Sequence, residues 1–101
     1  MQTKTIIYDF SNLSTQGSAE ELKALLEREL DGVDVSILVN NVGTARNAPL
    51  ENQSFSDLTH QINININAQT FMSMFVLPKL LSRSDGKNKS AMINVSCISA
   101  V

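Results

Sequence analysis

The pattern of apolar and polar positions is most distinct in the middle of the chain. Residues 35–39 (Val-Ser-Ile-Leu-Val) form a short apolar run that stops at the block 40–43 (Asn-Asn-Val-Gly). A run of this length with turn residues at its end is typical of a fully buried strand. In an α/β sheet, the carboxyl end of such a strand faces the crevice in which ligands bind. The block 40–43 is therefore a candidate binding site, with an ordinary strand-ending turn as the alternative.

The first third of the chain predicts a strand and a helix. Residues 3–9 (TKTIIYD) are rich in β-branched and aromatic side chains, which favour a strand. The next segment predicts a helix over 18–31, in which Ser18 is the N-cap, Glu21 completes a capping box and Gly32 ends the helix. Its apolar stripe is formed by four leucines at helical spacing: Leu22, Leu25, Leu26 and Leu30.

Residues 61–67 (QINININ) are ambiguous, because the strict alternation of Ile and Asn has the period of a half-buried strand. The flanking residues favour a helix, and no turn signal interrupts them. They extend one helical stripe through the segment: Leu58, Ile62, Asn65, Ile66, Gln69, Met72, Ser73 and Val76. We therefore expect one helix over 55–83, bent at Pro78. A third strand follows at 91–96, and the order β-α-β-α-β predicts an α/β fold with parallel strands.

Composition narrows the class of protein. A chain of 101 residues has room for one small domain or part of a larger one. A charged fraction of 18% excludes a disordered polyelectrolyte, and a net charge of −2 gives no electrostatic footprint for nucleic acid. The single cysteine cannot form an internal disulfide, which indicates a reducing compartment. We find neither a signal-peptide pattern nor an apolar run of about 18 residues that could span a membrane.

Four blocks, taken together, resemble the short-chain dehydrogenase/reductase family. Asp9-Phe10 ends the first strand, as the adenine-contacting acidic residue does in that family, and the block 40–43 matches its Asn-Asn-Ala-Gly motif. Asn65, thirteen residues before Pro78, matches the family's helix asparagine. Ile-Asn-Val-Ser at 93–96 matches the strand that delivers the catalytic serine. Within the family, the chain looks most like the branch of 17β-hydroxysteroid dehydrogenases and very-long-chain 3-oxoacyl-CoA reductases.

The resemblance implies a partial NAD(P)-binding Rossmann domain over 1–101, with a doubly wound parallel sheet. The implied reaction interconverts a ketone or 3-oxoacyl group and a secondary alcohol with NADP or NAD, on an acyl-CoA or steroid substrate. The implied parent protein is a homo-oligomer of the cytoplasm or of the endoplasmic-reticulum membrane surface. The alternative is a non-catalytic or truncated relative that binds only a nucleotide or a protein partner.

The resemblance also implies that the chain corresponds to the middle third of a family member. The family's Gly-rich phosphate turn and its Tyr-x-x-x-Lys segment then fall outside these residues. The only tyrosine, Tyr8, lies in the predicted first strand and cannot replace the catalytic one. We therefore expect this chain alone to be inactive. In the family's strand order two further strands separate 3–9 from 35–39, so we also expect it to bind no dinucleotide alone.

Five residues are implied to bind the cofactor. Asp9 would accept a hydrogen bond from the adenine amino group, and the backbone N–H of Phe10 would reach the ring; the alternative for Asp9 is a cap of local amides. Asn41, Val42 and Gly43 would lie under the adenosine ribose, largely through their backbone. Gly43 allows a positive φ or a close approach of a ligand.

Three residues are implied to take part in catalysis. Asn65 would bind, through its backbone, a water of the family's proton relay. Cys97 stands where the family places its catalytic serine, and a thiol is a poor hydrogen-bond donor to a substrate carbonyl. Ser96 is expected on the opposite sheet face for as long as the strand persists. Ser99 shares the parity of Cys97 and is the better replacement if the backbone turns in. The alternative for Cys97 is a small buried residue at a strand end.

The remaining polar residues of these elements receive structural interpretations. Asn40 is expected to tie its strand to a neighbouring strand. Asn63 and Asn67 lie off the apolar stripe, so we expect solvated side chains. His60 has no cysteine or carboxylate at ligand spacing and is expected to be a surface histidine, with no metal site.

Overall fold

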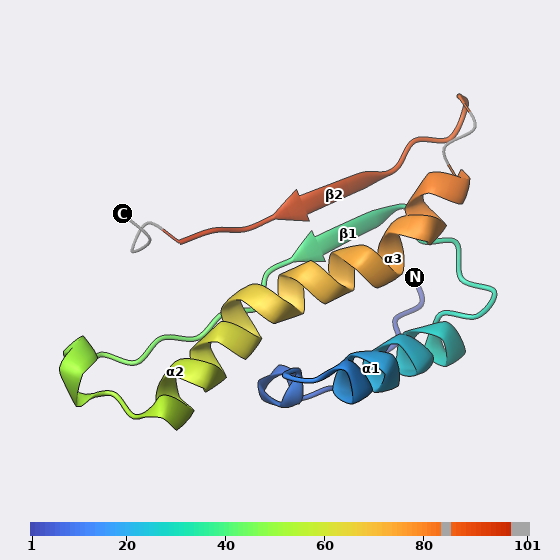
Figure 1. Ribbon diagram of the computed structural model, residues 1–101. Coiled ribbons are helices and arrows are strands. Elements are labelled where there is room, and N and C mark those ends of the chain that lie inside the picture. Colours follow the sequence, from blue (N-terminus) through green and yellow to red (C-terminus); the bar gives the residue numbers. More distant parts are fainter. Residues whose placement is uncertain (84–85, 98–101) are drawn as a thin grey trace.

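The computed structural model describes residues 1–83 and 86–97 as a mixed α/β arrangement (Figure 1). Its α-helices are α1 (Gln16–Glu29), α2 (Phe55–Ile62) and α3 (Ala68–Arg83), and its strands are β1 (Ile37–Asn40) and β2 (Ala91–Asn94). Two single turns of 3₁₀-helix, η1 (Phe10–Asn12) and η2 (Leu50–Asn52), and a π-helical segment, η3 (Asn63–Asn67), complete the order η1-α1-β1-η2-α2-η3-α3-β2.

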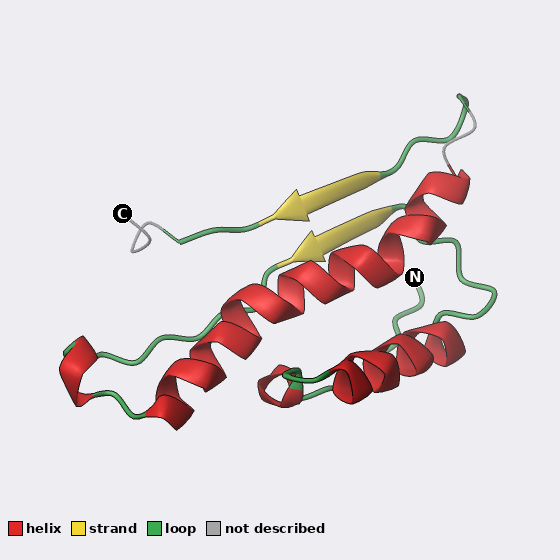
Figure 2. Ribbon diagram, viewed as in Figure 1, coloured by secondary structure: helices red, strands yellow, loops and turns green. Residues whose placement is uncertain are grey.

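The two strands pair in parallel, as the alternation of elements predicted. Their register runs from Ile37 opposite Ala91 to Asn40 opposite Asn94. Figure 2 shows the strands side by side, with α3 running along them and α1 next to α3. The core lies between these elements and is formed by Leu13, Ala19, Leu22, Leu26, Val76 and Leu80.

The strand β1 is covered on one face only, so the expectation of a fully buried strand is wrong. Leu38 packs against the core. On the opposite face, Ile37 and Val39 are 57% and 53% exposed, and Ile93 of β2 is 47% exposed. The helices α1 and α3 pack on the same side of the two strands, because their apolar residues meet in one cluster with Leu38. A doubly wound sheet is therefore not what the described residues form.

The predicted strand at 3–9 is not a strand in the structure, and this prediction was wrong. Residues 1–9 carry no ladder hydrogen bonds. An extended backbone becomes a strand only when a neighbour supplies donors and acceptors, and the described residues place no strand beside this segment. Its carboxyl end is held instead by packing, since Tyr8 and Phe10 meet edge to face with ring centroids 5.0 Å apart and both lie against the core.

The helix predicted over 55–83 is confirmed as the continuous run α2-η3-α3. Ser54 caps it in a reciprocal box with Asp57: the N–H of Asp57 donates to the Ser54 hydroxyl at 3.0 Å, and the Ser54 N–H donates to the Asp57 carboxylate at 3.0 Å. The Ile/Asn alternation is helical and takes the wider π-turn. Pro78 lies inside α3, and a bend at this residue stays a prediction.

The first helix begins earlier than predicted. Thr15, not Ser18, is its N-cap: the Thr15 hydroxyl accepts from the Ser18 N–H at 3.1 Å, and the Ser18 hydroxyl accepts from the Thr15 N–H at 3.0 Å. The Thr-x-x-Ser box thus prevails over the Ser-x-x-Glu box three residues later. Gly32 follows the helix with a φ of 70°, as expected for a residue that ends it.

Candidate functional site

A groove of about 660 Å³ opens at the carboxyl ends of the two strands. It is formed by the segment after β1, the helix run α2-η3-α3 and the segment after β2. Its lining residues are Asn41, Val42, Gly43, Thr44, Ala45, Gln61, Asn65, Gln69, Val95, Ser96 and Cys97. The structure therefore brings together five of the eight residues that the sequence indicated, from three separate parts of the chain: Asn41, Val42, Gly43, Asn65 and Cys97.

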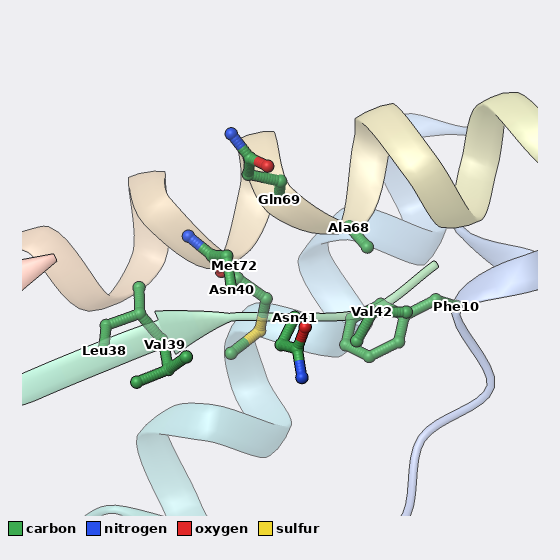
Figure 3. A pocket seen from close by; sticks show the side chains of 9 residues that line it. All are labelled: Phe10, Leu38, Val39, Asn40, Asn41, Val42, Ala68, Gln69 and Met72. Atoms are coloured by element: carbon green, nitrogen blue, oxygen red, sulfur yellow. The ribbon is translucent and has the colours of Figure 1, made fainter. Parts of the chain in front are cut away.

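A smaller hollow of about 60 Å³ lies beside this groove and shares Asn41 and Val42 with it (Figure 3). The ring of Phe10, carried by η1, lines it next to Val42. Leu38, Ala68 and Met72 complete its apolar walls. The hollow thus joins a sixth predicted residue, Phe10, to the end of β1.

Asp9 caps η1 locally. Its Oδ1 accepts from the backbone N–H of Ser11 at 3.0 Å and from the Ser11 hydroxyl at 2.7 Å. These two hydrogen bonds hold the pKa of the Asp9 carboxyl below its ordinary value, and the nearby His60 acts in the same direction. The geometry is that of the local cap, and the adenine contact of Asp9 stays a prediction.

Gly43 does not have the positive φ that the sequence allowed. A Cβ built on it would meet only the Oδ1 of Asn65, at an ordinary contact distance of 3.6 Å. Of the two roles that the sequence allows for Gly43, the close approach of a ligand remains, because Gly43 lines the open groove.

The side chain of Asn65 makes two hydrogen bonds to the loop after β1. Its Oδ1 accepts from the Thr44 N–H at 2.8 Å, and its Nδ2 donates to the Thr44 carbonyl at 2.9 Å. The backbone of Asn65 lies in the π-helical segment beside the groove. The side chain therefore fixes the loop, while the relay role assigned to the backbone stays a prediction.

Cys97 lines the groove and is exposed, so the alternative of a buried strand-end residue is wrong. Ser96, which is expected on the opposite face only while the strand persists, lines the same groove. The reason is that β2 ends at Asn94, after which strand alternation no longer sets the direction of side chains. Ser99 lies outside the described residues.

Asn40 has the structural role that the sequence indicated. It is 8% exposed, and its Nδ2 donates to the Ser73 hydroxyl at 3.1 Å and to the Oδ1 of Asn94 at 2.9 Å. One amide thus joins β1 to β2 and to α3.

Asn63 and Asn67 contradict the expectation of solvated side chains. Asn63 is 4% exposed and donates to the Ser11 carbonyl at 2.8 Å, and Asn67 donates to the Leu13 carbonyl at 2.9 Å. Sequence reasoning missed them because it followed the apolar stripe. The signal available was their spacing of four residues, which places two amides on one side of a helix.

Two further properties bear on the class of site. His60 is exposed, and among residues 1–83 and 86–97 no three His, Cys, Asp or Glu side chains lie close enough to hold a metal ion. None of the described helices has the length and apolar character needed to cross a membrane.

The chemistry of the groove and hollow fits the adenosine half of a dinucleotide. An apolar hollow walled by Phe10 and Val42 suits a flat ring, and the exposed Asn41 beside it offers amide donors and acceptors. The pyrophosphate would need a Gly-rich turn. The chain has four glycines, and they are widely separated: Gly17, Gly32, Gly43 and Gly86.

Sequence comparison finds the same relationship over almost the whole chain. The sequence profile of the short chain dehydrogenase family matches residues 2–101. Very-long-chain 3-oxoacyl-CoA reductase-A of Danio rerio is 32% identical over 105 residues, which cover 100% of this chain and 30% of that protein. Very-long-chain 3-oxoacyl-CoA reductase of Homo sapiens is 33% identical over 100 residues, which cover 95% of this chain and 28% of that protein.

Two solved structures of dehydrogenases have a similar fold. The bulky-bulky ketone specific alcohol dehydrogenase from Comamonas testosteroni aligns with a TM-score of 0.62 at 18% identity, over 86% of this chain and 32% of that one. Serine dehydrogenase from Escherichia coli aligns with a TM-score of 0.56 at 31% identity, over 86% and 37%. The chain spans about 30% of the length of the curated relatives it matches. Since the family profile matches nearly every residue, the chain belongs to the short chain dehydrogenase family.

Proposed function

We propose that these 101 residues belong to an NAD(P)-dependent oxidoreductase. They form the part of its active site that binds the adenosine of the cofactor and the part that contributes to the proton relay. The reaction interconverts a ketone or 3-oxoacyl group and a secondary alcohol. The observation that carries the proposal is the single groove that unites Asn41–Gly43, Asn65 and Cys97 from three separate segments. In a parallel sheet, the carboxyl ends of the strands are where ligands of α/β enzymes bind.

The proposed substrate class is a 3-oxoacyl-CoA, with a steroid ketone as the second choice. Reductases named for very-long-chain 3-oxoacyl-CoA in fish, human and fungi match at 30–34% identity. A gluconate 5-dehydrogenase from Gluconobacter oxydans also matches, at 31% identity over 86% of the chain. The similarity therefore supports carbonyl and alcohol chemistry broadly, and acyl-CoA more specifically.

Five residues of the groove, and Phe10 of the hollow beside it, have a part in the proposed reaction. The nicotinamide cofactor, when bound, supplies or accepts the hydride. Asn41–Gly43 support the ribose, Phe10 lies beside the adenine, and Asn65 holds the loop at Thr44 while its backbone takes part in proton relay. Cys97 faces the substrate carbonyl, where a thiol donates a weaker hydrogen bond than a hydroxyl would.

A second candidate function, from another class, is a binding module without catalysis. Cys97 in the serine position favours it, because a thiol is a poor hydrogen-bond donor to a substrate carbonyl. The hydroxyl of Tyr8 cannot replace the catalytic one, because Tyr8 packs against Phe10 and the core rather than lining the groove. Burial, with smaller contributions from Glu21 and Asp9, also raises the Tyr8 pKa, which opposes acid–base chemistry at neutral pH.

Sequencing the source transcript on both sides of these codons separates the two functions. A Gly-rich turn upstream and a Tyr-x-x-x-Lys segment shortly after Cys97 support the enzyme. The complete protein is then assayed for oxidation of NADPH with a 3-oxoacyl-CoA and, in parallel, with a steroid ketone. A stop codon in place of the Tyr-x-x-x-Lys segment, or a complete protein that turns over neither substrate, supports the binding module.

A further inference from the structure

The π-helical segment η3 carries asparagines on two sides of one helix. Successive helical residues are about 100° apart, so alternate residues point in nearly opposite directions. Asn65 reaches the loop after β1 at Thr44. Asn63 and Asn67 reach the other way, to Ser11 within η1 and to Leu13 directly after it. One helical segment therefore contacts both the loop beside the groove and the turn beside the hollow.

The pair formed by Asn63 and Asn67, which we name the amide clamp, holds two backbone carbonyls. The Asn63 amide donates to the Ser11 carbonyl at 2.8 Å, and the Asn67 amide donates to the Leu13 carbonyl at 2.9 Å. The two side chains are also joined to each other, since Nδ2 of Asn67 donates to Oδ1 of Asn63 at 3.0 Å. Asn63 is 4% exposed, so its bonds are made away from bulk water, where an unpaired amide or carbonyl is costly.

The amide clamp sets where η1 lies, whereas the other hydrogen bonds of that turn set only its shape. The caps made by Asp9 and the bond from the Leu13 N–H to the Phe10 carbonyl, at 3.1 Å, are all internal to residues 9–13. Among the described residues, side-chain hydrogen bonds from the rest of the protein to this turn come from Asn63 and Asn67. Burial of Leu13, at 1% exposed, adds an apolar anchor without direction.

We propose that Asn63 and Asn67 are positioning residues that seat the Phe10 ring against Val42 and so build the wall of the hollow. The ligand class is a flat heteroaromatic ring attached to a ribose, and this identity rests on the proposed function. The positioning itself rests only on the geometry of the clamp. The two statements can therefore fail separately.

The experiment compares three forms of the 101-residue chain by NMR: the natural sequence, Asn67→Leu and Thr70→Val. Leucine nearly matches asparagine in size but cannot donate to the Leu13 carbonyl. Thr70→Val is the matched control, because its hydroxyl bonds only to the Ile66 carbonyl of its own helix, at 2.8 Å. The readouts are amide hydrogen exchange along the chain and the nuclear Overhauser contacts between the Phe10 ring and the Val42 methyl groups.

We expect the Asn12 and Leu13 amides to exchange about two- to tenfold faster in Asn67→Leu, with weakened Phe10–Val42 contacts. Thr70→Val should leave both readouts as they are. Unchanged exchange and contacts in Asn67→Leu would overturn the proposal. Equal acceleration at core amides such as Leu22 and Leu80 would also overturn it, because that result describes a general loss of stability. If Asn67→Leu does not fold, Asn67→Ser is read by the same criteria.

The complete protein supplies a readout that a merely structural residue would not move. There, Asn67→Leu should raise KM for the dinucleotide about tenfold and leave kcat within about twofold. If the exchange result is as expected but Asn67→Leu has the KM of the natural sequence, the assignment of the ligand is wrong. The positioning of η1 by the amide clamp would then still hold. The exchange experiment contains no cofactor, so its outcome does not depend on the enzyme being active.

Discussion

The side chain of Asn65 pairs with the backbone of Thr44 through two hydrogen bonds, one accepted at 2.8 Å and one donated at 2.9 Å. An amide that satisfies both the N–H and the C=O of one residue imitates a neighbouring strand. The loop that leaves β1 is therefore fixed by a helix, at the point where the strand's own ladder has ended. This contact holds the floor of the groove next to Gly43.

Replacing Asn65 with alanine should destabilise the chain measurably. Both hydrogen bonds to Thr44 are lost, and hydrogen bonds to water compensate for only part of this loss. We therefore expect the free energy of unfolding to fall by about 1–2 kcal/mol. Gln69→Ala is the matched control, since Gln69 is an exposed amide on the same helix run and should change the value by less than about 0.5 kcal/mol. Urea unfolding of both variants measures this. Equal effects would show that the Asn65 contact contributes nothing specific.

The helix cap at Asp57 should make stability depend on pH in the acid range. The backbone N–H of Ser54 lowers the Asp57 pKa from its ordinary 3.8, with further help from the Ser54 hydroxyl, Arg46 and His60, against partial burial. A carboxyl with a lower pKa in the folded state binds its proton more readily when unfolded. Its stabilisation is therefore present above the unfolded pKa and lost as the pH falls through the folded pKa.

Urea midpoints between about pH 5 and pH 2 test this dependence. Asp57→Asn should reduce the acid loss of stability relative to the natural chain. Asp31→Asn, at an exposed residue beyond α1, should leave the loss as it is. A natural chain and an Asp57→Asn variant with identical pH profiles would contradict the assignment.

Cys97→Ser should increase the activity of the complete enzyme. A hydroxyl is a stronger donor than a thiol to the oxygen on which charge develops, so we expect kcat to rise about tenfold. Ser96→Ala serves as the control, because Ser96 lines the same groove. No gain from Cys97→Ser, together with a loss from Ser96→Ala, would transfer the role to Ser96.

The 101-residue chain alone should show no micromolar binding of NADP(H) in calorimetric titration. It contains a small apolar hollow beside Phe10 and Val42 but no Gly-rich turn for the pyrophosphate, and residues 1–9 belong to no strand. NAD(H) titrated under the same conditions should behave in the same way. A micromolar Kd for either dinucleotide would refute this expectation.

Much of the fold could be predicted because local patterns and tertiary packing agree. The helix over 55–83 follows from its stripe and from the cap at Ser54, and its ambiguous part, 61–67, is resolved by its flanks. The prediction of a strand at 3–9 was wrong because the local pattern and the tertiary structure disagree there. Its composition favours a pleated surface, but a strand also requires a partner, and propensity carries no information about partners.

The site was predicted less completely than the fold. The residues at the strand ends could be placed because parallel strands end at one edge, and Asn41, Asn65 and Cys97 do meet there. The spacing of Asn63 and Asn67 places both amides on one side of the helix, but it does not identify their partners. These are backbone carbonyls more than fifty residues away, and backbone carbonyls are the same in every sequence.

A crystal structure of the complete protein with NADP(H) decides whether the groove and hollow hold the adenosine of the cofactor. We expect the adenine to lie beside Phe10 and Val42 and the ribose to lie over the backbone of Asn41–Gly43. A dinucleotide bound away from the carboxyl ends of β1 and β2, with the groove open beside Asn65, would contradict this.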